Sequence, residues 1–548
     1  MTMMESGRQH TNRDSERRLE SLSPFELKNT LISLADDQQK RTAMQMVNAG
    51  RGNPNWIAAT PRDAFFLLGR FGMEEARRDW SEWDDLAGMP QESGIAGRLD
   101  AFLSDNASDP GADLLRRGVA YGVDELGFDA DAWVHELADS IIGDQYPVPD
   151  RMLTHVEKVV HQYLVQEMCG GRAPAADYDL FATEGGTAAM CYIFDSAIIN
   201  RLLHKGDKIA IMTPIFTPYL EIPHLERYQF DVMELKAERT NAEGFHTWQF
   251  PDSEINKLAD PDVKALFCVH PSNPPSVMMD PSTMDRIVSI VNDKNPELTI
   301  ITDDVYGTFV NGFRSLMGAL PRNTIGVYSF SKYFGCTGWR LGVIAVNQVN
   351  VFDERLATLP ASDKKILNER YGTLTLEPEK MRFIDRMVAD SRQVALNHTA
   401  GLSLPQQTQM ALFALHCLLD TDGEYKQICQ SIIARRMKAL TKGLGVELPS
   451  DPLAAHYYVE LDLLSWAERH WGAEFAAWMR DHYEPVDAIF RLAEQDSVVL
   501  LNGGGFDGPE WSVRISLANL PMAAYERIGK ALWDIGQEYK REFDARER

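Results

Sequence analysis

The chain contains 548 residues, of which 44% are hydrophobic and 25% are charged, and its formal net charge is -25 at pH 7. This length exceeds what a single hydrophobic core supports, so we expect two or three globular domains. The strong acidic balance argues against nucleic acid or an anionic membrane surface as a partner.

The first 18 residues are polar and carry charges of both signs, without the apolar segment that a signal peptide requires. No apolar run in the chain approaches the length of a membrane span. The six cysteines are scattered and form no C-x-x-C pair, which indicates reduced thiols and neither a disulfide framework nor a metal site. We therefore expect a cytoplasmic protein.

The N-terminal segment contains one expected helix and one expected strand, and residues 1–20 are expected to be disordered or arm-like. Residues 23–26 (S-P-F-E) have a capping-box pattern with proline at the first helical position, which predicts a helix to about Leu34. Residues 46–54 (M-V-N-A-G-R-G-N-P) predict a strand and a turn, in which Arg51 stands between two glycines. A tight turn is the simplest interpretation of that pattern alone.

Residues 57–142 are largely amphipathic and predict helices. Two interruptions are expected, at residues 88–97 and 105–111. No catalytic motif is present in this part of the sequence. We expect an insertion that packs against the rest of the chain or mediates assembly.

From residue 150 the sequence alternates between helical patterns, at Met152–Met168 and from Thr187, and short apolar runs. Most of these runs are continuous and rich in β-branched residues, which is typical of a sheet covered by helices on both faces. Helices between successive runs predict parallel crossovers, whereas a short turn joins the last two runs and allows an antiparallel strand. The seven expected strands are Tyr178–Thr183, Lys208–Thr213, Phe230–Leu235, Val263–Val269, Leu298–Thr302, Thr324–Phe330 and Leu341–Val346.

The C-terminal part predicts helices at Gln407–Leu419 and Tyr425–Leu444, and short strands at Tyr457–Leu461, Val498–Leu501 and Ser512–Ser516. We therefore expect an α/β fold in which a large domain with a seven-stranded, mostly parallel sheet is joined to a smaller α+β domain. The expected division is an N-terminal arm with part of the small domain (1–56), a helical insertion (57–142), the large domain (143–395) and the small domain (396–548).

Polar residues follow the expected strands, where binding sites form in open α/β sheets. Gly185, Gly186 and Thr187 open a helix after the first strand, and the free N–H groups there can hold an anion. Asp303 and Asp304 directly follow the fifth strand, where buried carboxylates need a partner. Phe216, Asn273 and Tyr306 follow other expected strands. Arg514 lies inside the expected C-terminal strand Ser512–Ser516, where an arginine needs a carboxylate partner.

The stretch Tyr328–Leu341 (Y-S-F-S-K-Y-F-G-C-T-G-W-R-L) completes this series. Lys332 follows the sixth strand beside Ser329 and precedes Arg340 by eight residues. A lysine at a strand end, beside hydroxyls and an arginine, can serve as a Schiff-base amine while the arginine pairs with a phosphate. A surface lysine in a loop is the alternative for this stretch alone, and the series of polar strand ends favours the first interpretation.

The motifs S-x-S-K-x-x-G-x-x-x-x-R, D-x-x-Y and N-P resemble those of the fold-type I pyridoxal-phosphate (PLP) enzymes, specifically the aspartate aminotransferase family. The resemblance covers residues 46–54 and the chain from Tyr146 to the C-terminus. It implies the PLP-dependent transferase fold, PLP as the cofactor, and a homo-oligomer built from dimers that share their active sites.

The resemblance also implies a role for each matching residue. Lys332 forms the Schiff base with PLP and shuttles protons, and Asp303 keeps the pyridinium nitrogen protonated so that the ring acts as an electron sink. Arg514 binds the substrate α-carboxylate. The phosphate is held by Gly185, Gly186, Thr187, Ser329, Arg340 and, from a neighbouring subunit, Tyr146. The phenolic oxygen is contacted by Tyr306 and by Asn273, which is also expected at the substrate.

Three positions depart from the family pattern. Phe216 replaces the tryptophan that stacks on the cofactor, and it still offers a ring. Tyr219 replaces the histidine behind the pyridinium-binding aspartate, and it can still donate a hydrogen bond. No arginine aligns with the one that binds the distal carboxylate in the family. Arg51, with Gly52 beside it, is our candidate for orienting that end of the substrate, and a turn or dimer contact is the alternative.

The helical segment at 57–142, the long helical stretch after residue 350 and the motif N-A-G-R-G-N-P-N-W at 48–56 resemble the aspartate 4-decarboxylases, a branch of this family. This resemblance implies β-decarboxylation of L-aspartate to L-alanine and carbon dioxide through a ketimine and an enamine, with aspartate aminotransferase as a side activity. The first alternative is an aminotransferase for aspartate or a related amino acid. The remote alternative is a non-enzymatic PLP-binding regulator, which the acidic balance and the short N-terminal segment disfavour.

Overall fold

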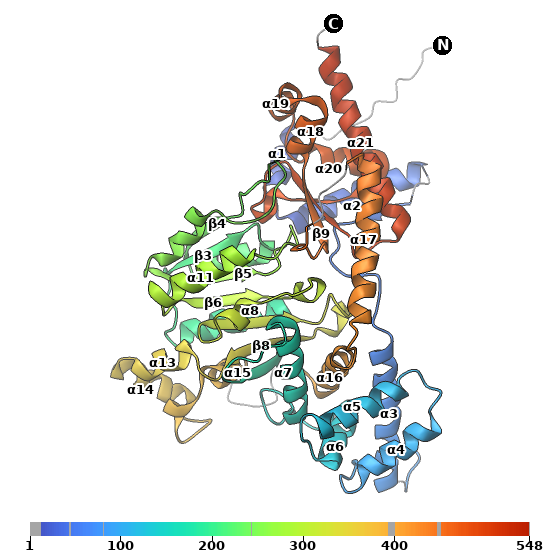
Figure 1. Cartoon of the computed structure of the whole chain (residues 1–548), viewed down its shortest axis with the longest axis vertical. Helices are drawn as coiled ribbons and strands as arrows, with labels where there is room; N and C mark the ends of the chain where they lie inside the picture. The colour runs from blue at the N-terminus through green and yellow to red at the C-terminus, as the bar shows by residue number, and fades with distance from the viewer. Residues whose placement is uncertain are drawn as a thin grey trace.

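A computed structural model describes residues 13–42, 45–80, 82–242, 244–392, 401–446 and 451–546. It shows a central part built on a large sheet, a helical unit, and a second part that combines helices with small sheets (Figure 1). The helical unit and the second part lie at opposite ends of the longest axis, with the large sheet between them.

The large sheet has seven strands in the order β2-β8-β7-β6-β5-β3-β4. β8 runs antiparallel to both of its neighbours, β2 and β7, and the other pairs are parallel. This confirms the predicted seven-stranded, mostly parallel sheet, with the antiparallel strand after the short turn. Four strands differ from the expected bounds by one residue at one or both ends. The strands are β2 (Tyr178–Thr183), β3 (Lys208–Thr213), β4 (Asp231–Lys236), β5 (Val263–Val269), β6 (Thr299–Asp303), β7 (Thr324–Ser329) and β8 (Gly342–Asn347).

Helices cover both faces of this sheet, which explains why most of its strands are apolar runs; the edge strand β4 is the exception. In β3, Ile209 and Ile211 belong to the main hydrophobic cluster, whereas Ala210 and Met212 belong to a second cluster beneath α11 (Pro281–Asp293). Alternate residues of one strand therefore pack into different layers. The other helices of the central part are α7 (Thr154–Met168), α8 (Gly186–Ile199), α9 (Thr217–Glu221), α10 (Asp252–Ile255), α12 (Leu316–Ala319), α13 (Val351–Thr358), α14 (Ala361–Tyr371) and α15 (Phe383–Arg392).

The helical unit occupies residues 60–142 and packs against α16 (Leu404–Leu418), which also contacts α7. Both interruptions expected in this region separate helices in the structure. The first begins earlier than expected, after α3 ends at Asp79, and it also ends early, because Gly94 adopts a left-handed conformation (φ 73°) and lets a helix begin at Ile95. A further break between Asp124 and Ala130 was not expected. The helices of the unit are α3 (Thr60–Asp79), α4 (Ile95–Asp105), α5 (Ala112–Asp124) and α6 (Ala130–Ile142).

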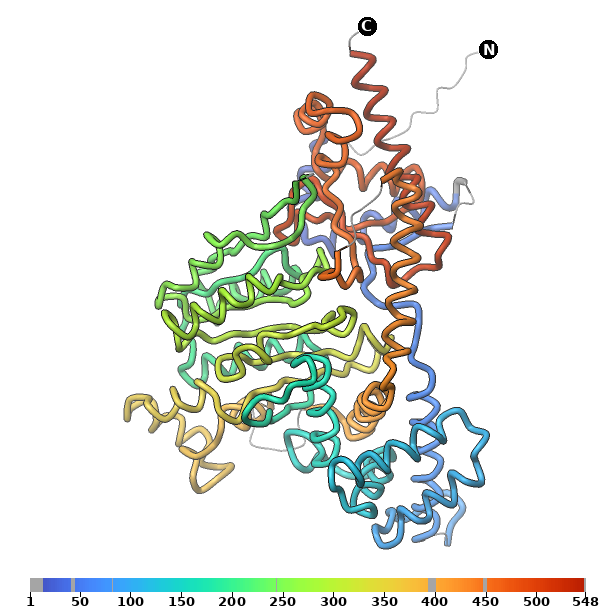
Figure 2. The backbone as a smooth tube through the Cα atoms, in the orientation of Figure 1, coloured from blue at the N-terminus to red at the C-terminus, as the bar shows by residue number. Residues whose placement is uncertain are grey.

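The second part brings both ends of the chain together. Its antiparallel sheet has the order β11-β12-β9, and beside it β1 (Val47–Asn48), from the N-terminal segment, pairs in parallel with β10 (Val498–Val499). The remaining elements are β9 (Tyr458–Asp462), β11 (Leu501–Asn502), β12 (Ser512–Ser516), α2 (Pro24–Thr42), α17 (Glu424–Leu444), α18 (Leu463–Trp471), α19 (Ala473–His482), α20 (Asp487–Asp496) and α21 (Met522–Ala545). Figure 2 shows α17 leading from α16 into this part, where it packs along α21.

Three expectations for these segments need correction. The single strand expected at 498–501 is divided into β10 and β11, which pair with different partners. The helix expected to end near Leu34 continues to Thr42, because its apolar face packs on α20. The expectation of disorder is wrong for α1 (Arg13–Glu20), in which Arg17 forms an ion pair with Glu484 at 2.9 Å. Residues 1–12 and the expected boundary between residues 395 and 396 lie outside the described residues.

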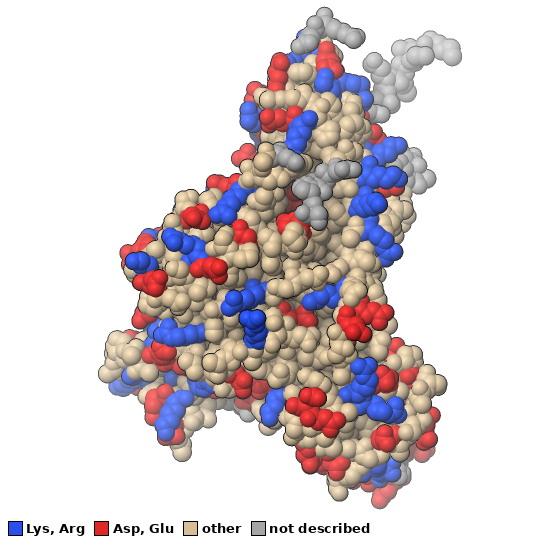
Figure 3. Space-filling model, viewed as in Figure 1, with Lys and Arg blue, Asp and Glu red and all other residues tan. Residues whose placement is uncertain are grey.

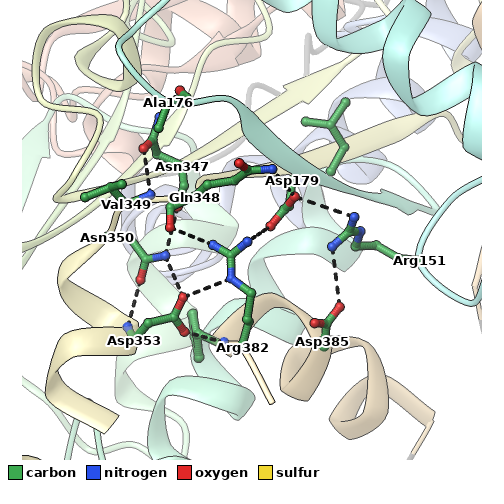
Figure 4. A network of polar contacts seen from close by, with 12 residues as sticks. Arg151, Ala176, Asp179, Asn347, Gln348, Val349, Asn350, Asp353, Arg382 and Asp385 are labelled. Atoms are coloured by element: carbon green, nitrogen blue, oxygen red, sulfur yellow. Dashed lines mark hydrogen bonds and ion pairs between the residues drawn. The ribbon is translucent and has the colours of Figure 1, made fainter. Parts of the chain in front are cut away.

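A partly buried polar network fastens the chain that follows the large sheet to the edge strand β2 (Figure 4). The Arg382 guanidinium forms an ion pair with Asp179 on β2 and with Asp353 on α13, the latter at 3.3 Å. Arg151 reaches the same Asp179 at 3.6 Å and Asp385 on α15 at 3.4 Å. These contacts fix the outer edge of the sheet, far from its carboxyl ends.

Charged side chains of both signs are interspersed over most of the face shown in Figure 3. None of the helices in the described ranges is long and apolar enough to cross a membrane. All six cysteines are free thiols, and among the described residues no group of three or more potential metal ligands occurs.

Candidate active site

A cavity of about 260 Å³ lies at the carboxyl ends of the central strands, and residues of the second part close it. Most residues that the sequence predicted for a cofactor or substrate line this cavity. They are Gly52, Gly186, Thr187, Phe216, Asn273, Asp303, Tyr306, Ser329, Lys332, Arg340 and Arg514. Most of these residues follow separate strands of the large sheet, whose parallel topology brings them to one edge, whereas Gly52 and Arg514 belong to the second part.

Lys332 stands three residues after the end of β7 and is half-buried. Its Nζ donates a hydrogen bond to the carbonyl oxygen of Gly52 at 3.1 Å. Gly52 belongs to the N-terminal turn, so a contact across 280 residues joins the two parts of the molecule at the lysine. The amine therefore faces the cavity and does not lie in a surface loop.

Asp303, the last residue of β6, is 6% exposed and has two hydrogen-bond donors. Tyr219 donates its hydroxyl proton to Oδ2 at 2.7 Å, and the Val305 N–H donates to Oδ1 at 3.2 Å. Burial raises the pKa of Asp303, while the bonds from Tyr219 and Val305 and the charge of Lys332 lower it. Tyr219 thus makes the hydrogen bond expected from its place behind the aspartate.

Tyr219→Phe tests this bond through the pH dependence of activity. Loss of the hydroxyl donor removes one influence that lowers the pKa of Asp303, so that pKa rises further. Because the ionised carboxylate is the active form, the acidic limb of the kcat profile is expected to move by about one pH unit toward higher pH. An unchanged acidic limb would show that Tyr219 does not tune Asp303.

Asp304 does not have the cationic partner that the sequence led us to expect for one of the paired carboxylates. It is fully buried, and its oxygens accept hydrogen bonds from Ser315 and Thr302. Burial raises the pKa of Asp304 to about 8, so the group is a neutral acid at neutral pH. Its hydrogen bonds fix the loop after β6, and Asp303 is the carboxyl group of the pair that lines the cavity.

One end of the cavity has the features of a phosphate site. α8 begins at Gly186, so the N–H groups of its first turn have no partner within the helix, and Gly186, Thr187, Ser329 and Arg340 line the cavity there. Gly185 adopts φ 96°, and a Cβ there would lie 2.3 Å from Nη2 of Arg340. Only glycine therefore lets the arginine approach the start of the helix.

Arg514 lies on the opposite wall, on β12, and is 1% exposed. Its Nη1 donates to the side-chain oxygen of Asn273 at 3.2 Å, and its Nη2 donates to the carbonyl oxygen of Gly50 at 3.1 Å. Within the described ranges Nε has no hydrogen-bond partner, and no carboxylate forms an ion pair with this guanidinium. A buried cation without a counter-charge is a site for an anionic ligand.

Three predicted residues are not among those that line the cavity: Gly185, which directly precedes the lining residue Gly186, Arg51 and Tyr146. Arg51 is exposed. The pKa of Lys28 on α2 is lowered, chiefly by the burial of Lys28 and also by the positive charge of Arg51. Tyr146 is 67% exposed. Its predicted partner is a neighbouring subunit, so its role stays a prediction.

Sequence reasoning missed two aromatic residues of the cavity wall. Phe25 on α2 packs edge-on against Phe216 with ring centroids 5.7 Å apart. Tyr458 on β9 lies beneath Arg514, with the guanidinium carbon 4.3 Å from its ring centroid. The capping box before Phe25 predicted only a helix start, and no motif marked Tyr458.

The residues present fit the predicted cofactor, PLP. A helix start with serine, threonine and arginine suits its phosphate, and a buried carboxylate with its own donor suits a protonated ring nitrogen. Lys332 supplies an amine between these two groups. The chemistry of the donor set therefore matches each end of the cofactor.

Comparisons with known proteins agree with this arrangement. The family model of aminotransferase class I and II matches residues 185–532. A bifunctional aspartate aminotransferase and L-aspartate beta-decarboxylase of Pseudomonas sp is 48% identical over 530 residues, which cover 96% of this chain and 98% of that relative. An aspartate aminotransferase of Pyrococcus horikoshii is 30% identical over 152 residues, or 27% of this chain and 37% of that one.

Solved structures show the same fold at low sequence identity. The aspartate aminotransferase of Rhizobium meliloti has a TM-score of 0.58 at 15% identity, covering 97% of this chain and 99% of that chain. A double mutant of the Thermus thermophilus aspartate aminotransferase has a TM-score of 0.57 at 17% identity, covering 95% and 98%. By its fold and by the extent of the sequence match, this chain belongs to the class I and II aminotransferases.

Proposed function

We propose that this chain is a PLP-dependent enzyme that decarboxylates L-aspartate to L-alanine and carbon dioxide, and that it also catalyses aspartate transamination. The observation that carries the proposal is the gathering of Lys332, Asp303 and Arg514 in one cavity. This cavity occurs in a chain that is 48% identical, over nearly its whole length, to a protein named for both activities.

The cofactor is held by residues at three of the strand ends. The start of α8, with Thr187, Ser329 and Arg340, binds the phosphate. Asp303 keeps the ring nitrogen protonated, and the hydrogen bond from Tyr219 orients the Asp303 carboxylate. When bound there, PLP supplies an electron-withdrawing ring that stabilises negative charge on the substrate carbon atoms.

Arg514 and Lys332 act on the substrate. Arg514 binds the α-carboxylate through its two terminal nitrogens, and Asn273 holds the guanidinium in place. Lys332 removes the α-proton and returns a proton, because it is the one amine among the residues that line the described cavity. Both proposed reactions share this proton removal.

The two reactions diverge at the distal end of the substrate. The cations among the described lining residues are Lys332, Arg340 and Arg514, and each has a role elsewhere in the cavity. A β-carboxylate that no arginine holds tightly can leave as carbon dioxide, whereas entry of water leads to transamination. We propose that Arg51, at the N-terminal turn, orients this carboxylate from outside the lining.

The assembly and location are also proposed. Tyr146 is exposed and suits a contact with the phosphate in a neighbouring subunit, which gives a homo-oligomer built from dimers with shared sites. The six free thiols support a cytoplasmic location. The division into an N-terminal segment, helical insertion, large domain and small domain is supported by the separate packing of α3–α6 and of the second part.

Incubation of the holoenzyme with L-aspartate alone tests the proposal. Without any keto acid, NMR is expected to show alanine formed over many turnovers, because decarboxylation regenerates the cofactor form that started the cycle. Addition of 2-oxoglutarate is expected to yield glutamate as a minor product. If glutamate forms but alanine does not, the chain is an aminotransferase and the decarboxylase proposal fails.

A further inference from the structure

Three buried tyrosines form a cluster beside Lys332. Tyr306, Tyr457 and Tyr458 have ring centroids 5.0–5.6 Å apart. Tyr306 donates its hydroxyl proton to the Tyr458 hydroxyl oxygen at 3.1 Å. Of the pair Tyr457 and Tyr458, only Tyr458 lines the cavity that contains Lys332. The mechanism derived above gives this phenol no role.

The phenol of Tyr458 and the amine of Lys332 flank the same point in the cavity. A Cβ on Gly52 would lie 2.6 Å from the Tyr458 hydroxyl oxygen and 3.1 Å from Lys332 Nζ. The Gly52 carbonyl oxygen accepts hydrogen bonds from Lys332 Nζ at 3.1 Å and from the Tyr457 hydroxyl at 2.8 Å. Tyr457 thus fixes a carbonyl that receives the amine, and the absent side chain at Gly52 leaves room for both groups.

The electrostatic surroundings distinguish Tyr458 from its two neighbours. Burial raises the pKa of Tyr458, but the positive charges of Lys332 and Arg514 and the hydrogen bond from Tyr306 outweigh it, so the pKa lies below the ordinary value. The pKa values of Tyr306 and Tyr457 are instead raised well above the ordinary value, chiefly by burial. Tyr458 is therefore the phenol of the cluster that loses its proton most easily.

We propose that Tyr458 is a positioning and proton-exchange residue for Lys332, which holds the lysine amine with Gly52 whenever that amine is not bonded to the cofactor. The proton transfer involves only Lys332 and Tyr458 and needs no other acid or base. A proton passes from the Lys332 ammonium to the Tyr458 phenolate, which leaves a neutral amine and a neutral phenol, and it returns by the reverse transfer. The neutral amine is the form that removes a substrate proton.

This role rests on the proposed function, because both proposed reactions require Lys332 to leave and rejoin the cofactor. It also predicts how the two reaction rates change when Tyr458 is altered. Since the α-proton step precedes the point at which decarboxylation and transamination diverge, Tyr458 affects the rate of both without changing their ratio. A residue that held the β-carboxylate would change the ratio instead.

The first experiment measures the proton on Tyr458 directly, with no substrate present. Tyrosine ionisation is followed by near-ultraviolet phenolate absorbance as pH rises, in the full chain after removal of PLP, so that Lys332 carries its free amine. One tyrosine is expected to ionise before the others in the wild type and in the Tyr163→Phe control. The control removes one hydroxyl of a different buried, hydrogen-bonded pair, in which the hydroxyl oxygens of Tyr163 and Tyr328 are 2.7 Å apart. Tyr458→Phe is expected to lose that early step. Its persistence in Tyr458→Phe would overturn the proposal.

The second experiment follows exchange of the aspartate α-hydrogen with deuterated water by NMR. Tyr458→Phe keeps the ring beneath Arg514, so PLP affinity and KM for aspartate are expected to remain near wild type. The exchange rate and kcat are expected to fall together by about 10- to 100-fold, as for loss of a proton-transfer group, with an unchanged ratio of alanine to glutamate.

Other results separate this proposal from the proposed function. Loss of PLP binding or a large rise in KM, with exchange per bound enzyme unchanged, would assign Tyr458 a purely structural role and overturn the inference. If the wild-type enzyme forms no alanine but the early ionisation and the exchange defect are found, the decarboxylase proposal fails while the role of Tyr458 stands.

Discussion

Lys332→Ala is expected to abolish both activities on aspartate and the visible absorbance of covalently bound PLP. The variant lacks both the amine that bonds the cofactor and the base that moves the substrate proton, so kcat falls by at least about 10⁴-fold. Absorbance spectra of the purified protein and NMR assays of alanine and glutamate measure the two effects. The fold should persist, because among the described residues the Lys332 amine makes one hydrogen bond, to the Gly52 carbonyl oxygen, and no ion pair.

The matched control for this variant is Lys365→Ala, which removes a lysine that is 79% exposed and pairs with Glu369 on the surface. It should keep the absorbance and the activity of the wild type. Absorbance retained by Lys332→Ala at wild-type intensity would mean that another lysine binds the cofactor.

Arg514→Lys is expected to lower kcat/KM for aspartate by about 10²- to 10³-fold, which corresponds to roughly 3–4 kcal/mol. Lysine keeps the charge but cannot donate two parallel hydrogen bonds to a carboxylate, and it leaves Asn273 without its present donor. The change should appear mainly as a higher KM, since the α-carboxylate is bound before and during the chemical step. Steady-state kinetics with aspartate measures it.

Arg435→Lys on the exposed side of α17 serves as the control, because its guanidinium contacts only its own helix. PLP affinity should be equal in both variants and in the wild type. A normal KM in Arg514→Lys would place the α-carboxylate elsewhere and would contradict the substrate orientation that we propose.

The arrangement of the large sheet could be predicted from the sequence because its physical signal is strong. The strands other than the edge strand β4 are largely buried on both faces, so most of the runs are apolar. The helices between successive strands favour parallel crossovers. The N-terminal region gave a weaker signal. Arg13–Glu20 is polar except for Leu19, and its helix is held by contacts such as that of Arg17 with Glu484, which lies 467 residues away.

The candidate site was predictable where its residues follow strands and not elsewhere. Lys332 and Asp303 belong to motifs with fixed spacing, and parallel strands end at the same edge, so their proximity followed from the topology. Phe25 and Tyr458 reach the cavity only because the second part of the molecule packs over it. Tyr458 lies in an apolar strand pattern, where a tyrosine is ordinarily a core residue, so tertiary packing alone reveals its position.

The central claim is that Lys332 is the lysine that binds PLP in the cavity at the carboxyl ends of the large sheet. Borohydride reduction of the holoenzyme makes the bond between cofactor and lysine permanent, and mass spectrometry of a digest then locates the modified residue. We expect the added mass on the peptide that contains Lys332, at close to one equivalent per chain. Modification of any other lysine, with Lys332 unmodified, would contradict the account.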